Sequence, residues 1–123
     1  MNIIRLKKNK DFQKIYQKGR FFAHPLIVLY VLKRPSTDQV RVGFAVGRKT
    51  GNAVKRNRVR RQLKEIFRLS PTSQLFNNCD LVIMARKKAL ETDYDSLKEA
   101  YDYVQNRALT FLNKEKSTKD EKK

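Results

Sequence analysis

The sequence of 123 residues is poor in several residue types that mark whole classes of protein. It has no Trp, three Pro, four Gly and a single Cys. The lone Cys79 cannot form an intramolecular disulfide or a cysteine-rich metal site, which is typical of proteins kept in a reducing cytosol. Cys79 and the single His24 cannot supply three protein ligands to zinc without carboxylates in support. We therefore expect no metal site in this chain.

Long apolar runs are also missing. The longest covers residues 26–32, which is the length of an interior strand and far short of the ~20 residues that cross a bilayer. The first ten residues are basic and no apolar stretch follows them, so we expect no secretory signal. With 40% hydrophobic residues the chain can still bury a core. These features predict a single soluble cytoplasmic domain.

Acidic residues are scarce, since 12 Asp and Glu face 29 Lys and Arg, for a net charge of +17. The positive charge lies mainly in residues 1–20 and 48–68, whereas residues 89–113 are acidic. A charge that served only solubility would have no reason to segregate in this way. A membrane surface would require a basic amphipathic helix with a large apolar face. The distribution favours a nucleic acid as the partner, because each neutralised phosphate releases counterions and adds to affinity.

The first half of the chain predicts a helix followed by strands. Asn9 is a suitable N-cap for a helix that ends at Lys18, and Gly19 then occupies a position that favours positive φ. Residues 21–33 read as one long strand, in which Pro25 predicts a bend or an edge. Residues 40–46 alternate between a bulky face and a bare face that contains Gly43. The bare face predicts either close packing of a helix or room for a ligand backbone.

The second half predicts a helix from Asn52 to about Leu69, a buried strand over 79–85 and a helix from about residue 93 or 96 to 113. Ser96 and Glu99 are placed to form a capping box for the last helix. Residues 114–123 contain no apolar side chain and predict a disordered charged tail after a domain that spans 1–113. The order of these elements predicts an α+β sandwich.

Two groups of residues are candidate binding sites. In the helix 52–69, one sector is apolar (Val59, Leu63, Ile66 and Phe67) and the neighbouring sector is basic, so arginine forks suited to phosphate are held on a packed helix. Asn57 in that sector suits a base edge or ribose, or else holds a neighbouring arginine or a backbone group. The second group is Phe12, Tyr16 and Tyr30, which predict either core packing or a stacking platform for single-stranded nucleic acid.

The string GNAVKRNRVRR at residues 51–61, preceded by VGFAVGRK at 42–49, closely resembles the signature of the bacterial ribonuclease P protein subunit family. The segment LKKNKDF at residues 6–12 and the chain length resemble that family too, and the likeness covers residues ~5 to ~113. The resemblance implies a single αβββαβα domain with a left-handed βαβ crossover, a fold similar to the second domain of a small-subunit ribosomal protein. This hand is an exception to the usual right-handed rule.

The resemblance also implies a function. Family members bind a large catalytic RNA, and the two together remove the 5′ leader of precursor tRNA by Mg²⁺-dependent hydrolysis, with the metal held mainly by the RNA. No membrane and no protein partner is required. Residues implied to contact the catalytic RNA are Lys49, Lys55, Arg56, Asn57, Arg58, Arg60, Arg61, Lys64 and Arg68. Residues implied to form a cleft for the single-stranded leader are Arg5, Phe12, Lys14, Tyr16 and Tyr30.

The chain itself offers no obvious hydrolytic centre. Its carboxylates do not form a pair suited to two-metal hydrolysis, and one His with one Cys gives no credible nucleophile–base set. We therefore expect no catalytic residue here, which agrees with a family whose active site is RNA. Two alternatives remain at this stage: a general RNA-binding or ribosome-associated protein, and a DNA-binding protein that places the basic helix in a major groove.

Overall fold

A five-stranded mixed sheet organises the chain. The structure is a computed structural model that describes residues 3–34, 39–47 and 51–121, with side chains up to residue 115. The elements in chain order are β1 (Ile3–Arg5), α1 (Asn9–Lys18), β2 (Arg20–Ala23), β3 (Ile27–Lys33), β4 (Val40–Val46), α2 (Ala53–Leu69), the 3₁₀ turn η1 (Ser73–Phe76), β5 (Cys79–Ala85), the 3₁₀ turn η2 (Lys87–Glu91) and α3 (Tyr94–Glu121).

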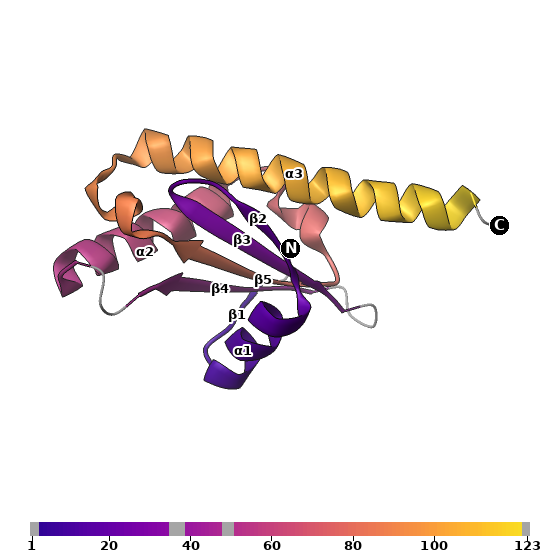
Figure 1. Cartoon of the computed structure of the whole chain (residues 1–123), viewed down its shortest axis with the longest axis horizontal. Helices are drawn as coiled ribbons and strands as arrows, with labels where there is room; N and C mark the ends of the chain where they lie inside the picture. The colour runs from indigo at the N-terminus through magenta and orange to yellow at the C-terminus, as the bar shows by residue number, and fades with distance from the viewer. Residues whose placement is uncertain (1–2, 35–38, 48–50, 122–123) are drawn as a thin grey trace.

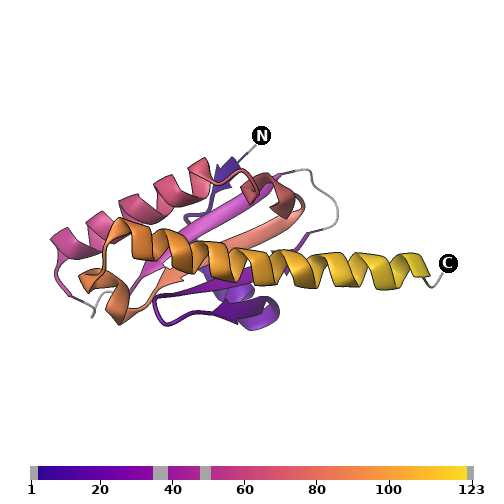
Figure 2. The same ribbon diagram turned by 90° about the horizontal axis from the view of Figure 1, so that it is seen from above.

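The helices cover the two faces of the sheet unequally. The strand order is β1-β4-β5-β3-β2, with β1 and β5 parallel to β4 and with β3 antiparallel to β2 and β5. In Figure 1, α1 lies on one face of the sheet, and α2 and α3 lie on the other. Figure 2, seen from above, shows α2 and α3 crossing the same face. The predicted α+β sandwich is confirmed, and β4–α2–β5 is the parallel βαβ unit for which the resemblance implies a left-handed crossover.

The two faces of β4 explain how both layers pack. Val40, Val42 and Val46 are buried in the main core, which α2 and α3 close. Gly43 on the opposite face lies against α1, because a Cβ built on it would come 2.5 Å from Cζ of Phe12. At Gly43, close packing of a helix, which is one of the two predictions for the bare face of this strand, is confirmed.

Local boundaries differ from the sequence prediction at the hairpin. Residues 21–33 form two antiparallel strands, β2 and β3, because the chain reverses at His24-Pro25-Leu26. His24 donates its backbone N–H to the carbonyl of Ile27 at 2.8 Å, and its Nδ1 accepts from the N–H of Leu26 at 3.0 Å. The predicted single long strand is therefore wrong, since the turn at Pro25 is complete.

The capping at three helix ends differs from prediction. The N-cap of α1 is Lys8, which makes no side-chain capping bond, and Gly19 is extended at φ −81°. A Cβ at Gly19 would lie 2.7 Å from the carbonyl oxygen of Ile15. Glycine is therefore required at this position because the backbone approaches so closely, and not because of a positive φ. Helix α3 starts after Asp93, which is one of the two predicted starts, and the Oδ1 of Asp93 accepts the backbone N–H of Ser96 at 2.8 Å, so Asp93 and not Ser96 is the capping residue.

The secondary structure at the two ends of the chain also differs from the sequence prediction. The short strand β1, which the sequence pattern does not reveal, pairs Ile3 with Val40 and Arg5 with Val42. At the other end, α3 continues to Glu121, beyond the predicted end of the helix at residue 113. The added segment is rich in Lys and Glu, which are good helix formers even without an apolar face to pack.

Candidate nucleic-acid interface

Helix α2 is held so that its basic sector faces outward. Asn52 is its N-cap, and the Oδ1 of Asn52 accepts the backbone N–H of Lys55 at 2.9 Å. The predicted apolar sector is buried throughout, because Val59, Leu63, Ile66 and Phe67 are each at most 3% exposed. The side chains that the helix turns away from this core form what we call the α2 basic face: Arg56, Asn57, Arg60, Arg61, Lys64 and Arg68.

Hydrogen bonds within the α2 basic face hold two of its guanidinium groups. Arg60 donates from Nη1 to the Oδ1 of Asn57 at 2.9 Å, and Arg56 donates from Nη1 to the carbonyl of Gly51 at 2.8 Å. Asn57 therefore holds a neighbouring arginine, which is one of the roles that its position in the sequence left open. Ordered forks lose less side-chain entropy when they bind an anion.

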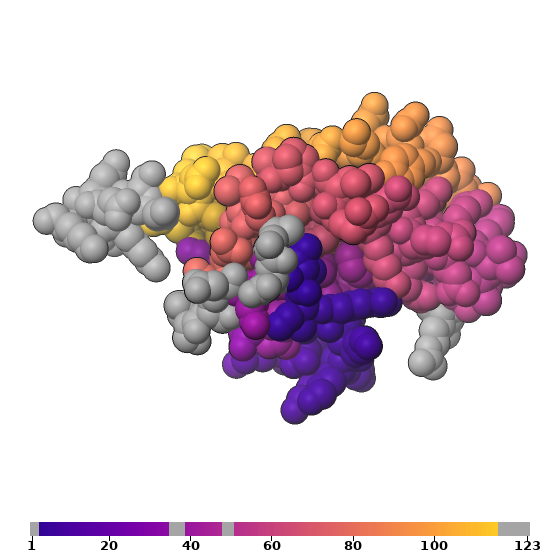
Figure 3. Space-filling view, turned by 180° about the vertical axis from the view of Figure 1, so that it is seen from behind, coloured from indigo at the N-terminus to yellow at the C-terminus, as the bar shows by residue number. Residues whose placement is uncertain are grey.

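Strand β1 brings a further cation to this face. Burial, followed by the nearby positive charges of Arg5 and Arg60, lowers the pKa of Lys64. The N-terminal segment lies against α2 in the space-filling view of Figure 3. Arg5 is opposite Val42, which packs into the core on the α2 side of the sheet. Arg5 thus lies with the α2 basic face, whereas the resemblance groups it with the residues of the leader cleft.

Lys55 and Arg58 lie on a different side of α2 from this face. Lys55 pairs through Nζ with the Oε1 of Glu91 at 2.5 Å, and this ion pair lowers the pKa of the Glu91 carboxyl. Arg58 donates from Nη2 to the carbonyl of the buried Leu90 at 2.6 Å. Both side chains therefore join the first turns of α2 to η2. Lys49, the remaining residue of the predicted RNA-binding set, lies outside the described residues.

The predicted aromatic group is assembled between α1 and the sheet. Tyr16 lies 4.9 Å from Tyr30 in an edge-to-face contact and 6.4 Å from Phe12, between ring centroids. Burial, followed by the proximity of Tyr30, raises the pKa of Tyr16. Phe21 on β2 extends the group, since its ring is 6.1 Å from Tyr30 and 65% exposed. The four rings run from the buried side of α1 to an open edge of the sheet.

A cavity of about 670 Å³ opens beside these rings, lined by Lys7, Asn9, Phe12, Tyr16 and Ala45. We call this cavity, with Tyr30 and Phe21, the α1 cleft. Lys14 does not line it, because at 100° per residue Lys14 projects about 160° away from Tyr16 around the helix. The cation that does line the cleft is Lys7, which sequence reasoning missed although it belongs to the basic N-terminal run. Phe21 was missed because its strand was read as continuous with β3.

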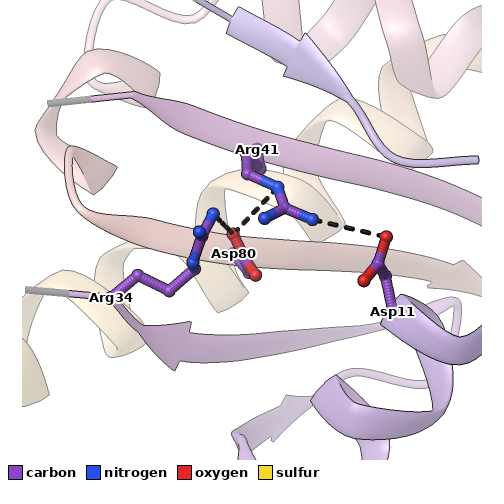
Figure 4. A network of polar contacts seen from close by, with 4 residues as sticks. All are labelled: Asp11, Arg34, Arg41 and Asp80. Atoms are coloured by element: carbon purple, nitrogen blue, oxygen red, sulfur yellow. Dashed lines mark hydrogen bonds and ion pairs between the residues drawn. The ribbon is translucent and has the colours of Figure 1, made fainter. Parts of the chain in front are cut away.

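A charged network fixes the other flank of α1 to the sheet (Figure 4). Arg41 on β4 pairs through Nη2 with Asp11 of α1 at 3.4 Å and through Nε with Asp80 of β5 at 3.5 Å. Arg34 also pairs with Asp80, which is only 5% exposed. Removing one partner of a buried charge is costly, so this network should hold α1 in one position beside the cleft.

No catalytic set appears among the described residues. The thiol of Cys79 is buried, and this burial raises its pKa to about 11, so it is a poor nucleophile at neutral pH. His24 is engaged in the β2–β3 turn. Within the part of the chain that the structure describes, no three His, Cys, Asp or Glu side chains are grouped to hold a metal ion. No described helix is long and apolar enough to cross a membrane.

The fold and these surfaces define a small basic α+β domain with a cationic helix face and an aromatic cleft. Comparison with known proteins gives the family, since the family model described as Ribonuclease P matches residues 2–109. The chain is 34% identical over 114 residues to the ribonuclease P protein component of Bacillus pumilus, covering 93% of this chain and 95% of that one. It is 41% identical over 99 residues to that of Natranaerobius thermophilus, covering 80% and 84%.

Solved structures agree with the sequence comparison. The RNase P protein of Staphylococcus aureus superposes with a TM-score of 0.76 at 33% identity, covering 85% of this chain and 94% of that one. The RNase P protein of Thermotoga maritima gives a TM-score of 0.68 at 28% identity, covering 83% and 96%. The chain therefore belongs to the ribonuclease P protein family.

Proposed function

We propose that this chain is the accessory subunit of a ribonuclease P holoenzyme, in which it binds the catalytic RNA and the 5′ leader of precursor tRNA. Membership of the family supports this function. The observation that carries it is the convergence of Arg5 from β1 with Arg60 and Lys64 on the face of α2, where burial, followed by the positive charges of Arg5 and Arg60, lowers the pKa of Lys64. Such crowding is relieved when phosphates bind, so the cost of holding these cations together is recovered in the complex.

The α2 basic face is the surface that we assign to the catalytic RNA. Two of its arginines, Arg60 and Arg56, are pre-oriented by Asn57 and by the carbonyl of Gly51, which suits forked contacts with phosphate oxygens. Lys55 and Arg58 support this surface from the side, since their side chains bind η2. We therefore treat these two as positioning residues.

The α1 cleft is the surface that we assign to the single-stranded leader. Its aromatic rings provide faces for unpaired bases, and Lys7 in its lining provides charge for the backbone. The rings are held by the sheet and by the Asp11–Arg41–Asp80 network, so a leader entering the cleft would be kept in register with the rest of the substrate.

Hydrolysis itself we assign to the RNA subunit. Mg²⁺ supplies the charge stabilisation that phosphodiester hydrolysis needs. The described residues offer no cluster of carboxylates for it, so in this proposal the metal is held mainly by the RNA. The protein contributes by lowering the repulsion between the phosphates of the two RNAs and by holding the leader.

Cleavage of precursor tRNA at low Mg²⁺ tests the proposal. The full chain, a bacterial ribonuclease P RNA and the mixture of both are each incubated with a 5′-labelled precursor. We expect cleavage at the mature 5′ end to be on the order of tenfold faster in the mixture than with RNA alone, about 1.4 kcal/mol of the barrier. The matched control is Lys18→Gln/Lys98→Gln, which removes two exposed charges away from both proposed surfaces and should still stimulate.

Two other results would contradict the proposal in different ways. Cleavage by the protein alone would show a catalytic centre in the chain. Tight RNA binding without any stimulation would favour a general RNA-binding protein.

A further inference from the structure

A second basic surface lies at the end of the sheet where β4 and β5 both finish. The two strands are parallel and Val46 is in register with Ala85, so the chain leaves both strands at the same end of the sheet. After β4 it leads to the start of α2. After β5 it continues directly into Arg86, Lys87 and Lys88, which are all exposed.

The β2–β3 turn lies at the same end of the sheet and gives this surface a fixed shape. Arg86 donates its backbone N–H to the carbonyl of Leu26 at 2.9 Å, and its Nη1 donates to the carbonyl of His24 at 3.4 Å. Together these segments line a cavity of about 530 Å³ formed by Ala23, His24, Pro25, Arg86, Lys87 and Lys88. The basic residues are therefore built onto a strand end and a tight turn.

Helix α3 extends the surface on its other side. Tyr103 is 47% exposed and meets His24 edge to face, with ring centroids 5.6 Å apart. Arg107 lies over the Tyr103 ring at 5.6 Å. We call the six residues Arg86, Lys87, Lys88, His24, Tyr103 and Arg107 the hairpin-end surface.

The chemistry of the hairpin-end surface fits a phosphodiester backbone. Three cations and His24 line one cavity, and Arg107 lies beside it over the ring of Tyr103, which meets His24 and adds a hydroxyl and an aromatic face. Three acids lie close in the sequence to these residues: Glu91 is paired with Lys55, while Glu99 and Asp102 are exposed on α3 before Tyr103. The four cations of the surface outnumber Glu99 and Asp102, so its charge is positive.

Continuity with α2 indicates which RNA this surface would take. Turn η2 starts at Lys87 and is tied to α2 by the Lys55–Glu91 ion pair and by the Arg58–Leu90 hydrogen bond. The hairpin-end surface therefore continues from the α2 side around the end of the sheet. Helix α1, which forms one wall of the α1 cleft, lies in contrast on the opposite face of the sheet from α2 (Figure 1).

We propose that the hairpin-end surface binds the phosphate backbone of the catalytic RNA, as a contact additional to the α2 basic face. This inference rests on the proposed function, since it assigns a second surface to the same partner.

Binding of full-length chain to a bacterial ribonuclease P RNA, measured over a range of salt concentrations, tests this inference. The variant Lys87→Gln/Lys88→Gln is compared with Lys18→Gln/Lys98→Gln, which loses the same charge elsewhere. Arg86 is left intact because its hydrogen bonds hold the turn. We expect the slope of log K against log salt to fall by about one for each lysine at positions 87 and 88, with the control slope unchanged. Acylation of Lys87 and Lys88 in the wild-type chain should also slow when the RNA is bound.

Each contrary outcome overturns a different statement. Equal slopes in the two variants, with Lys87 and Lys88 acylated as fast in the complex as in the free chain, would overturn the hairpin-end contact alone. Loss of affinity for precursor and mature tRNA but not for the catalytic RNA would overturn the assignment to the catalytic RNA. If the wild-type chain shows no salt-dependent binding to the catalytic RNA, the proposed function itself fails.

Discussion

Neighbouring arginines of one basic run have different roles in this protein, since one stabilises the fold and another is exposed on the surface. Arg58 and Arg61 are three residues apart on α2, and the family resemblance implies an RNA contact for both. In the structure Arg61 is exposed on the α2 basic face, whereas Arg58 is half-buried and donates to the carbonyl of Leu90. A charged hydrogen bond to a buried carbonyl stabilises the fold, because without it that carbonyl would be left without its donor.

Substitution of these two arginines should therefore have separable effects. Arg61→Ala should reduce the salt slope of catalytic-RNA binding by about one and leave thermal stability nearly unchanged. Arg58→Ala should lower the free energy of unfolding by about 1–2 kcal/mol and change the slope less. Urea unfolding and salt-dependent binding on the same samples measure both. A loss of slope for Arg58→Ala equal to that for Arg61→Ala would mean that Arg58 also contacts RNA.

At the scale of elements, the α1 cleft exists because a helix is seated closely on one strand and clamped at one flank. Gly43 leaves no gap under Phe12, so a larger residue would displace the Phe12 ring. The Asp11–Arg41 ion pair holds the opposite flank. The space that stays accessible between α1 and the sheet is lined by the row of aromatic rings, which ends in the exposed Phe21 of β2.

Phe21 gives the sharper test of that cleft, because its ring is mostly exposed and its loss should not unfold the chain. Phe21→Ala should weaken binding of leader-bearing precursor tRNA by about 1 kcal/mol, roughly fivefold in Kd, if an unpaired base stacks on the ring. Mature tRNA should bind as before. The matched control is Leu75→Ala, which removes a similarly exposed apolar side chain on η1. Equal losses for precursor and mature tRNA would remove Phe21 from the leader site.

At the scale of the whole molecule, the net charge of +17 means that attraction within ion pairs and repulsion between unpaired cations both affect the free energy of unfolding. Ion pairs such as Arg41–Asp80 and Lys55–Glu91 engage acids with specific partners. The excess of cations nevertheless repels itself in the compact state, and this repulsion is screened by salt.

Added salt should therefore stabilise the free chain while it weakens RNA binding. Between about 0.1 M and 1 M NaCl the screening length falls from ~10 Å to ~3 Å, and we expect the midpoint of thermal unfolding to rise by about 4 °C, roughly 1 kcal/mol. Circular dichroism at 222 nm without RNA measures this midpoint. A midpoint that falls with salt would mean that ion pairs outweigh the repulsion.

The sequence by itself determined the features that depend on local periodicity. The buried sector of α2, the strand Cys79–Ala85 and the segregation of charge were all predicted, because side chains three or four apart on a helix, or two apart on a strand, share a face whatever lies opposite. The same spacing predicted that Phe12 and Tyr16 lie together. Membership of a family with a known signature added the topology.

Only the tertiary structure decided which residues of each set work together. Strand β1 is too short to be recognised alone and forms because β4 offers it a parallel edge, which carries Arg5 to Lys64 and away from the α1 cleft. The pairing of Arg58 with Leu90 and of Arg86 with the His24 turn joins segments 32 and 62 residues apart. Such contacts depend on strand register and on how the layers pack, and neither is encoded in the spacing of any one segment.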